Sequence, residues 1–174
     1  NIEKFFGVNT VYGKDETKNP SSSFKDRASL VAIAKAIEYQ NKIICGASTG
    51  NAASSLACLS TQTGITVKVF VPQSAPIAKI AQLLVYGAKV FPVCGTYDSA
   101  FDLSIEASNK FNWYNRNTGY NPFTREGKKT CSYEIAEQTN FSKIDYIFIP
   151  TGDGNILTGI YKGFYDLLKT NIID

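Results

Sequence analysis

The sequence predicts an α/β fold in which a parallel sheet is covered by helices on both faces. Short apolar segments of strand type alternate along the chain with longer segments of helix type, which is the order that parallel sheets require. Two of the predicted strand-to-helix connections, at 46–51 and 150–155, are rich in glycine and small polar residues. Backbone N–H groups at a helix start favour phosphate or carboxylate, so both connections are candidate anion sites.

The individual elements follow from the spacing of apolar residues. Leu30, Ile33 and Ile37 recur at helical spacing, whereas 66–71 is a short apolar run of strand type. An opening strand is expected at 5–8 and a polar loop at 119–129. The predicted helices are 25–39, 52–61, 76–86, 99–111, 131–138 and 156–168, and the other predicted strands are 42–45, 66–71, 89–93, 113–114 and 146–149.

Length and charge bound the class of protein. A chain of 174 residues holds one domain or two small lobes. Its net charge of +3 is scattered along the sequence, so nucleic-acid binding is not indicated. No apolar run reaches the roughly 18 residues that a membrane span needs, and the first residues do not begin a signal peptide. We therefore expect a cytoplasmic protein that does not act at membranes.

Histidine is absent from the sequence, and the four cysteines are far apart. This pattern disfavours the usual zinc sites, a metal site built from a CxxC motif, and the disulfide framework of a short secreted protein. It also removes Ser-His and Cys-His nucleophile pairs. Acid–base chemistry must then come from Lys, Tyr, Asp, Glu or a cofactor.

Lys25 stands where a polar loop runs into the first long helix. The positive pole of a helix disfavours an ammonium group, so the pKa of this lysine is lowered if the site is also dry. A neutral amine reacts with a carbonyl cofactor, which makes Lys25 a candidate carrier of pyridoxal phosphate. The alternative is a solvated lysine in an ordinary helix with Ser23 as its N-cap and Asp26 in its first turn.

Residues 23–27, Ser-Phe-Lys-Asp-Arg, follow Asn19-Pro20 and resemble the cofactor-lysine motif of threonine synthases, which are fold type II pyridoxal phosphate enzymes. Many members have Thr-Gly at the place of Ser21-Ser22 and Gly at the place of Ala28. The resemblance covers nearly the whole chain. It implies that Lys25 is the catalytic residue and carries pyridoxal 5'-phosphate.

Residues 47–51, Ala-Ser-Thr-Gly-Asn, resemble the family loop that faces the cofactor ring and the substrate carboxylate. By that match Asn51 contacts the phenolic oxygen of the ring, and Ser48 and Thr49 hold the carboxylate. The alternative is that Asn51 is simply the N-cap of the next helix.

Residues 152–155, Gly-Asp-Gly-Asn, resemble the cup for the cofactor phosphate, formed here by Gly152, Asp153, Gly154 and Asn155. Many threonine synthases have one more residue between the two glycines, whereas related lyases have a shorter loop of this kind. A carboxylate in a phosphate site is repulsive, so Asp153 is expected to point away while the N–H groups bind. A plain turn is the alternative.

Residues 121–130 are similar to the family segment ending in Glu-Gly-x-Lys-Thr, which borders the substrate pocket. Arginine does not occupy its most familiar place there. The candidate ligands for a substrate phosphate are therefore Arg116, Arg125 and Lys129, although each is more often a solvated charge.

The resemblance implies a two-lobed fold like that of the tryptophan synthase β subunit, with parallel sheets flanked by helices. The small α/β lobe is expected at 28–118, and 1–27 with 119–174 are expected to belong to the larger cofactor-binding lobe. The family's later half, with the group that faces the pyridine nitrogen, does not occur in this sequence, so we expect an incomplete chain. A homodimer is compatible with the resemblance.

The implied activity is that of a lyase of threonine biosynthesis, which converts O-phospho-L-homoserine and water to L-threonine and phosphate. A small-molecule amino acid is then the substrate. Within the same chemistry, a threonine or serine dehydratase or a β-replacement synthase is an alternative, which the shorter glycine loop favours. A non-catalytic module that binds anions or nucleotides is an alternative of another class.

Overall fold

Four parallel strands form the central sheet in a computed structural model that describes residues 2–173. The strands are ordered β3-β2-β1-β4, and every neighbouring pair is parallel. Their carboxyl ends therefore lie along one edge, where ligands of open α/β sheets bind. The strands are β1 (Ile43–Ala47), β2 (Thr66–Pro72), β3 (Lys89–Val93) and β4 (Tyr114–Asn115).

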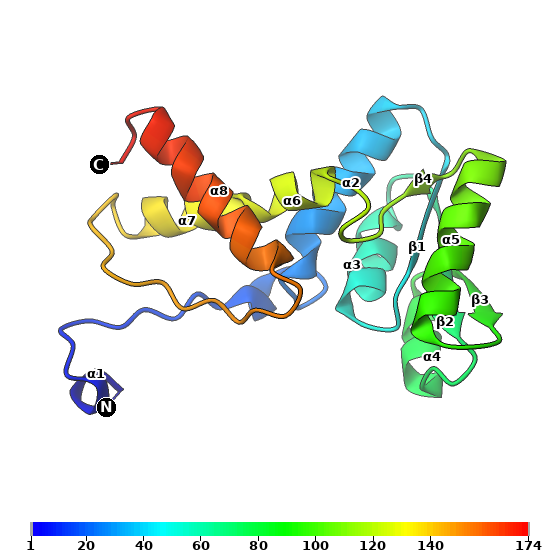
Figure 1. Cartoon of the computed structure of the whole chain (residues 1–174), viewed down its shortest axis with the longest axis horizontal. Coiled ribbons are helices and arrows are strands. Elements are labelled where there is room, and N and C mark those ends of the chain that lie inside the picture. The colour runs from blue at the N-terminus through cyan, green and yellow to red at the C-terminus, as the bar shows by residue number, and fades with distance from the viewer. Residues whose placement is uncertain (1, 174) are drawn as a thin grey trace.

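Helices cover both faces of this sheet, as the alternating sequence predicts (Figure 1). Side chains of Ile44 and Val69 point to one face and pack with apolar residues of three helices, whereas Cys45 and Phe70 point to the other face and pack with α5. The helices on the first face are α2 (Lys25–Glu38), α3 (Asn51–Ser60) and α4 (Ile77–Val85), and the helix on the second is α5 (Tyr97–Phe111).

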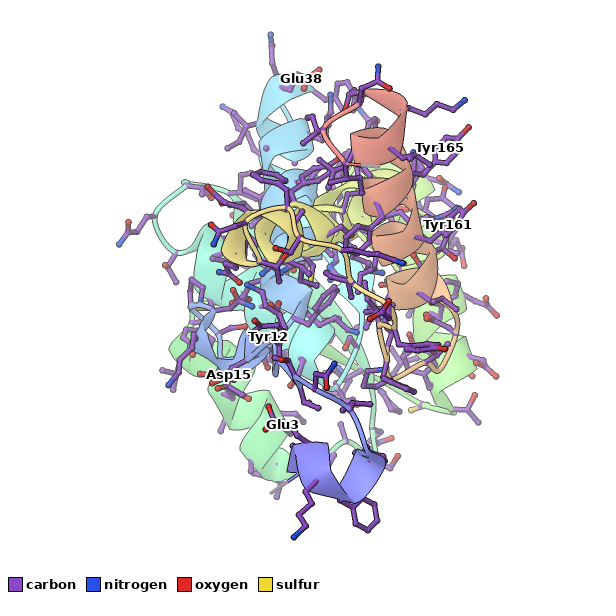
Figure 2. The ribbon with its side chains drawn as sticks, turned by 90° about the vertical axis from the view of Figure 1, so that its left-hand side faces the viewer. Glu3, Tyr12, Asp15, Glu38, Tyr161 and Tyr165 are labelled. Carbon is purple, nitrogen blue, oxygen red and sulfur yellow. The ribbon has the colours of Figure 1, made fainter. Side chains whose placement is uncertain are left out.

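Three further helices lie on the far side of α2 from the sheet (Figure 1). They are α6 (Phe123–Lys128), α7 (Thr130–Gln138) and α8 (Asn155–Lys169). On the outside of α8, the exposed rings of Tyr161 and Tyr165 stack with their centroids 6.3 Å apart and project outward (Figure 2). Helix α6 packs on both α2 and α8, so it connects the sheet half of the molecule to the other helices.

Glycines make these helix crossings close. A Cβ atom at Gly127 of α6 would lie 2.1 Å from the carbonyl oxygen of Arg27 in α2. At Gly159 of α8, a Cβ would lie 2.5 Å from the Cβ of Lys128. These close crossings bring together the start of α2, the end of α6 and the start of α8.

The N-terminal segment differs from the prediction. Residues 5–8 were expected to form a strand, but the chain begins with a short helix, α1 (Ile2–Phe6), which buries none of its side chains and is followed by Gly7 at φ +65°. No strand in the described range runs beside it. Helix α1 lies away from the sheet (Figure 1). A 3-10 helix, η1 (Glu16–Lys18), precedes the Lys25 loop.

Two other predictions are wrong. The expected loop at 119–129 contains α6, which starts because the side chain of Asn121 accepts a hydrogen bond from the N–H of Phe123 and Pro122 already has helical backbone angles. The expected strand at 146–149 is not formed, since no strand in the described residues pairs with it, and Phe148 is 92% exposed. The remaining predicted helices and strands are confirmed, with small shifts at their ends.

Candidate cofactor and substrate site

Lys25 is the first residue of α2, and its neighbours in the motif fix it there. The buried carboxylate of Asp26 accepts hydrogen bonds from the N–H of Ser21, at 2.6 Å, and from the Ser21 hydroxyl. The Ser23 hydroxyl accepts a bond from the N–H of Lys25 at 3.3 Å, although the N-cap position itself falls on Phe24. These hydrogen bonds therefore hold the polar loop before Lys25 against the first turn of α2.

Arg27 anchors the same helix from its other side. Its guanidinium is 8% exposed and forms ion pairs at 2.7 Å with Glu16 of η1 and Glu134 of α7. It also donates to the hydroxyl of Thr130 at 2.9 Å. The hydrogen bonds from Arg27 lower the pKa of Glu134 to about 2. Asp26 and Arg27 thus have structural roles, whereas the amine of Lys25 is not used in this way.

The Lys25 side chain is half-buried and has no hydrogen bond or ion pair within residues 2–173. Burial lowers its pKa, the positive charge of Arg116 lowers it further, and Asp153 acts in the opposite direction. The lowered pKa expected for a lysine at a dry helix start is confirmed in direction. Burial and Arg116 are its main causes.

The first glycine loop follows β1 at the carboxyl edge of the sheet. Asn117, beyond the end of β4, accepts a hydrogen bond from the N–H of Ala47 at 2.7 Å, so the ends of the two strands are tied together. The hydroxyl of Ser48 accepts a bond from the N–H of Gly50 at 3.1 Å. Gly50 is the N-cap of α3, and Asn51 is an exposed first helical residue. The side chain of Asn51 is therefore not used as a cap.

The second glycine loop leads into α8. Gly154 adopts φ +74°, which glycine tolerates best, and is the N-cap of the helix. Asp153 does not turn away as expected, because its carboxylate accepts a hydrogen bond from the N–H of Asn155 at 3.0 Å. Lys25 and Lys128 are close enough to interact with the carboxylate of Asp153, and this attraction favours a side chain that faces them over one that faces only water. One N–H group of the expected phosphate cup is therefore already bonded.

Arg116 lines the small cavity beside the first glycine loop, and its charge acts on Lys25 and Lys128. Its side chain is 4% exposed and donates only to hydroxyls, of Ser29 at 3.3 Å and Thr118 at 3.2 Å. Its Nε has no partner, and none of the described carboxylates forms an ion pair with it. Burial lowers the pKa of Arg116 to about 10. A buried guanidinium without an anion is costly, so this position favours a negatively charged ligand.

Arg125 and Lys129 differ in what they can reach. Arg125 is half-buried on α6, and its positive charge is close enough to lower the pKa of Lys128. Lys129 contacts Asp166 at 2.6 Å and Glu126 at 2.7 Å. Burial acts to lower the pKa of Lys129, but these hydrogen bonds outweigh burial and raise it. The charge of Lys129 is therefore balanced by two carboxylates of the protein, whereas Arg125 stays a candidate ligand for a substrate phosphate.

The structure adds Lys128, which sequence reasoning missed. Its side chain is only 1% exposed, and its Nζ donates to the side-chain oxygen of Asn155 at 3.1 Å. Burial, followed by the charges of Lys25 and Arg116, lowers its pKa to about 8. The helical spacing of Thr124, Gly127 and Lys128, which share the buried face of α6, is the signal that could have revealed it.

A family model described as pyridoxal-phosphate dependent enzyme matches residues 1–173. The chain belongs to this family. A curated relative, the threonine synthase of Methanocaldococcus jannaschii, is 38% identical over 175 residues, which is 100% of this chain and 43% of that protein. The chain thus spans less than half the length of this curated relative.

Two solved structures resemble the fold of this family member. The processed form of threonine deaminase isoform 2 from Solanum lycopersicum has a TM-score of 0.84 at 27% identity, over 95% of this chain and 45% of that one. Diaminopropionate ammonia lyase of Escherichia coli has a TM-score of 0.83 at 20% identity, over 96% of this chain and 52% of that one. The predicted fold class of a fold type II enzyme is confirmed.

The residues present fit the cofactor of the family. Pyridoxal phosphate carries an aldehyde and a phosphate dianion, and the structure offers an amine with a lowered pKa beside two buried cations. The unpartnered Nε of Arg116 shows that the positive charge is not balanced by the described residues. An anionic group is therefore suited to the site formed by Lys25, Arg116, Lys128 and the two glycine loops.

The lowered pKa of Lys128 predicts a dependence of stability on pH. The unfolded chain holds this proton up to a pKa of about 10.5 and the folded chain only up to about 8, so unfolding takes up a proton in between. We expect Lys128→Met to be more stable than wild type at pH 7, and this advantage to shrink by about 1 to 3 kcal/mol as pH rises through that window. Urea unfolding from pH 7 to pH 10 measures it. A constant difference between the two proteins would contradict the buried ammonium.

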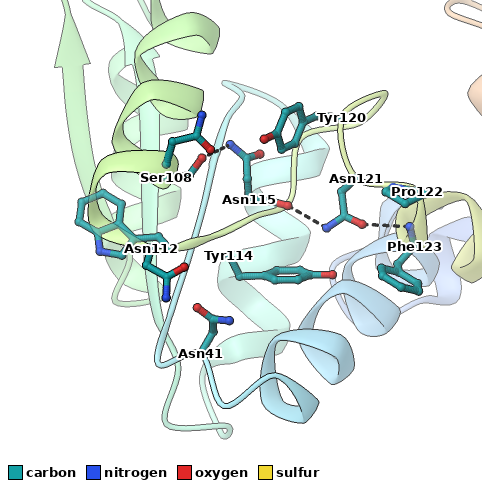
Figure 3. A pocket seen from close by; sticks show the side chains of 11 residues that line it. Asn41, Ser108, Asn112, Tyr114, Asn115, Tyr120, Asn121, Pro122 and Phe123 are labelled. Carbon is teal, nitrogen blue, oxygen red and sulfur yellow. Dashed lines mark hydrogen bonds between the residues drawn. The ribbon is translucent and has the colours of Figure 1, made fainter.

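A more spacious recess lies elsewhere on the described chain. It measures about 420 Å³ and is lined by amide and aromatic side chains, among them Asn41, Tyr114 and Tyr120 (Figure 3). Several of its amides are already bonded, since Asn115 donates to Ser108 and Asn121 donates to the carbonyl oxygen of Asn115. At the carboxyl edge, by contrast, the cavity beneath Ser48 and Arg116 holds only about 10 Å³. The candidate site residues therefore lie at the carboxyl edge of the sheet and do not line the recess of about 420 Å³.

Membrane spans and metal sites are two other features to consider. No helix within residues 2–173 is long and apolar enough to cross a membrane. Over the same residues, histidine, cysteine, aspartate and glutamate do not form a group that could hold a metal ion. All four cysteines are free thiols, with Cys45 and Cys131 buried.

Proposed function

We propose that the protein containing this chain is a threonine synthase, which converts O-phospho-L-homoserine and water to L-threonine and phosphate. The observation that carries the proposal is the convergence of Lys25 with the unneutralised cations Arg116 and Lys128 at the carboxyl edge of the sheet. A reaction between a phosphorylated cofactor and a phosphorylated amino acid requires such an excess of positive charge. The 38% identity to a threonine synthase over the whole chain supports the same function.

Each residue of the site has a distinct proposed role. Lys25 holds the cofactor through its amine and moves protons at the substrate's carbon atoms, since its lowered pKa leaves the amine available as a base. Ser48 and Thr49 bind the substrate carboxylate beside the start of α3, where the positive end of the helix favours an anion. The exposed Asn51 orients the cofactor ring from its place beside that loop.

Gly152, Asp153, Gly154 and Asn155 are proposed to form the cup for the cofactor phosphate. Arg116 and Arg125 are proposed to bind the phosphate of the substrate, because neither has a carboxylate partner among the described residues. Lys129 is left out of this set, since it is paired with Asp166 and Glu126. When bound, pyridoxal phosphate supplies an electron sink for the bond that breaks at the substrate's α-carbon.

The structure supports a division of the chain into the expected lobes. The sheet and its covering helices fall within 28–118 apart from the first residues of α2, whereas α6, α7 and α8 pack on one another beyond it. We propose that 28–118 is the small lobe and that 1–27 and 119–174 belong to the larger one. A cytoplasmic location and a homodimer remain proposals from the family resemblance.

A panel of substrates tests the proposal. Purified protein containing this chain, loaded with pyridoxal phosphate, is given O-phosphohomoserine, threonine or O-acetylserine, and phosphate, threonine, ketobutyrate and ammonia are measured. We expect phosphate and threonine in equal amounts from O-phosphohomoserine alone. Arg125→Gln is expected to raise the KM for that substrate by about 10-fold or more, because a charge-assisted hydrogen bond is lost.

One result would favour the second candidate function. The likeness to threonine deaminase, together with the short glycine loop at 152–155, makes a dehydratase the strongest rival. Ketobutyrate and ammonia from threonine, without phosphate release from O-phosphohomoserine, would reassign the protein to that reaction. Arg125→Gln would then leave the KM for threonine unchanged.

A further inference from the structure

Lys128 is a fully buried lysine whose surroundings do not balance its charge. It is 1% exposed, and within residues 2–173 its ammonium makes one hydrogen bond, to the side-chain oxygen of Asn155 at 3.1 Å. An ammonium group has three donors, and a buried charge is normally paired with an anion. Two donors of Lys128 are therefore available within the described structure.

The groups around Lys128 are mostly of its own sign. Lys25, Arg116 and Arg125 are close enough to disfavour its charge, and Asp153 alone among the neighbouring groups favours it. Asp153 is exposed, and its carboxylate bonds to the N–H of Asn155 and does not pair with Lys128. The cluster therefore has more cations than anions, which is the electrostatic pattern of a site built for a dianion.

Packing fixes the direction of this side chain. Gly127 lies against the backbone of α2 and Gly159 against the Cβ of Lys128, so the lysine stem is held between α6 and α8. Its Nζ is thereby delivered to Asn155, the first residue of α8, directly beside the loop 152–155. The neighbouring Lys129 points to Asp166 instead, so only one lysine of the pair reaches the loop.

We propose that Lys128 binds the phosphate group of pyridoxal phosphate from the protein side of the loop 152–155, and that its ammonium supplements the backbone N–H groups there. Since Asp153 occupies the N–H of Asn155, this loop has a donor fewer than its length provides, and the lysine supplies a charged one. The inference rests on the proposed function, because it requires that the cofactor phosphate occupies this loop.

Binding of two cofactor forms tests the inference without measuring turnover. The dissociation constants of pyridoxal phosphate and of pyridoxal, which lacks the phosphate, are measured by absorbance titration for wild type, Lys128→Met and Lys128→Gln. We expect both variants to weaken pyridoxal phosphate about 10- to 100-fold, the loss of one charge-assisted bond, and to change pyridoxal less than about twofold. Lys79→Met, which removes an exposed lysine of α4, is expected to change neither.

The two neutral variants separate charge from packing. Glutamine keeps a polar N–H group without the charge, so a loss in both variants follows the charge, and the glutamine variant answers the question if the methionine variant does not fold. Unchanged affinity for pyridoxal phosphate would overturn the role of Lys128, as would equal losses for the two cofactor forms. A wild-type protein that does not bind pyridoxal phosphate would reject the proposed function and this inference together, whereas the other outcomes leave the proposed function standing.

Discussion

Lys25→Ala is expected to lower turnover by about 10²- to 10⁴-fold, because it removes the amine that we propose moves protons at the substrate. The fold is expected to survive, since the side chain is half-buried at a helix start and makes no hydrogen bond or ion pair within residues 2–173. Thermal unfolding and steady-state rates, measured on the same samples, separate the two effects. The matched control is Lys79→Ala, at an exposed position of α4.

The electrostatics of the site sharpen this prediction. Removing Lys25 takes away one of the cations that lower the pKa of Lys128, so the variant should be at least as stable as wild type. A variant that loses activity only because it unfolds would contradict the assignment of Lys25 as catalytic. A variant that retains normal turnover would reject it altogether.

Gly127→Ala is expected to destabilise the protein by about 1 to 3 kcal/mol or more, because the new methyl group overlaps the backbone of α2. Its Cβ would lie 2.1 Å from the carbonyl oxygen of Arg27 and 3.0 Å from the Cα of Ala28. Backbone atoms cannot rotate away as a side chain does, so α2 and α6 must separate. Urea unfolding measures the loss in the free energy of unfolding.

The separation should also affect the site, because Lys25 belongs to α2 and Lys128 to α6. We expect Gly127→Ala to weaken cofactor binding in addition to stability. Gly13→Ala is the control, since no atom lies within 4 Å of its added Cβ. Equal stability of the two alanine variants would show that the α2–α6 contact is looser than the structure indicates.

The fold could be predicted from the sequence where its signals are local. The start of α2 at Lys25 and the alternation of strands and helices from 42 to 114 follow from apolar spacing and loop residues. The strand expected at 146–149 depends instead on a partner, and its apolar side chains remain exposed without one. Sequence pattern alone does not reveal whether such a partner is present.

The motifs point to Lys25 and both glycine loops as site residues, and these assignments stay predictions. The motifs did not distinguish Lys128 from Lys129. That distinction depends on which face of α6 is buried, and α6 was expected to be a loop. The role of Asp153 likewise depends on the cations around it, which come from segments far apart in the sequence.

The most direct test of the account is to locate the cofactor on the chain. Purified protein is incubated with pyridoxal phosphate, reduced with borohydride, digested and analysed by peptide mass spectrometry. The account predicts one modified residue, Lys25, with Lys128 and Lys129 unmodified and with no label in Lys25→Ala. Label on Lys128 or another lysine in place of Lys25, or labelled Lys25→Ala protein, would contradict it.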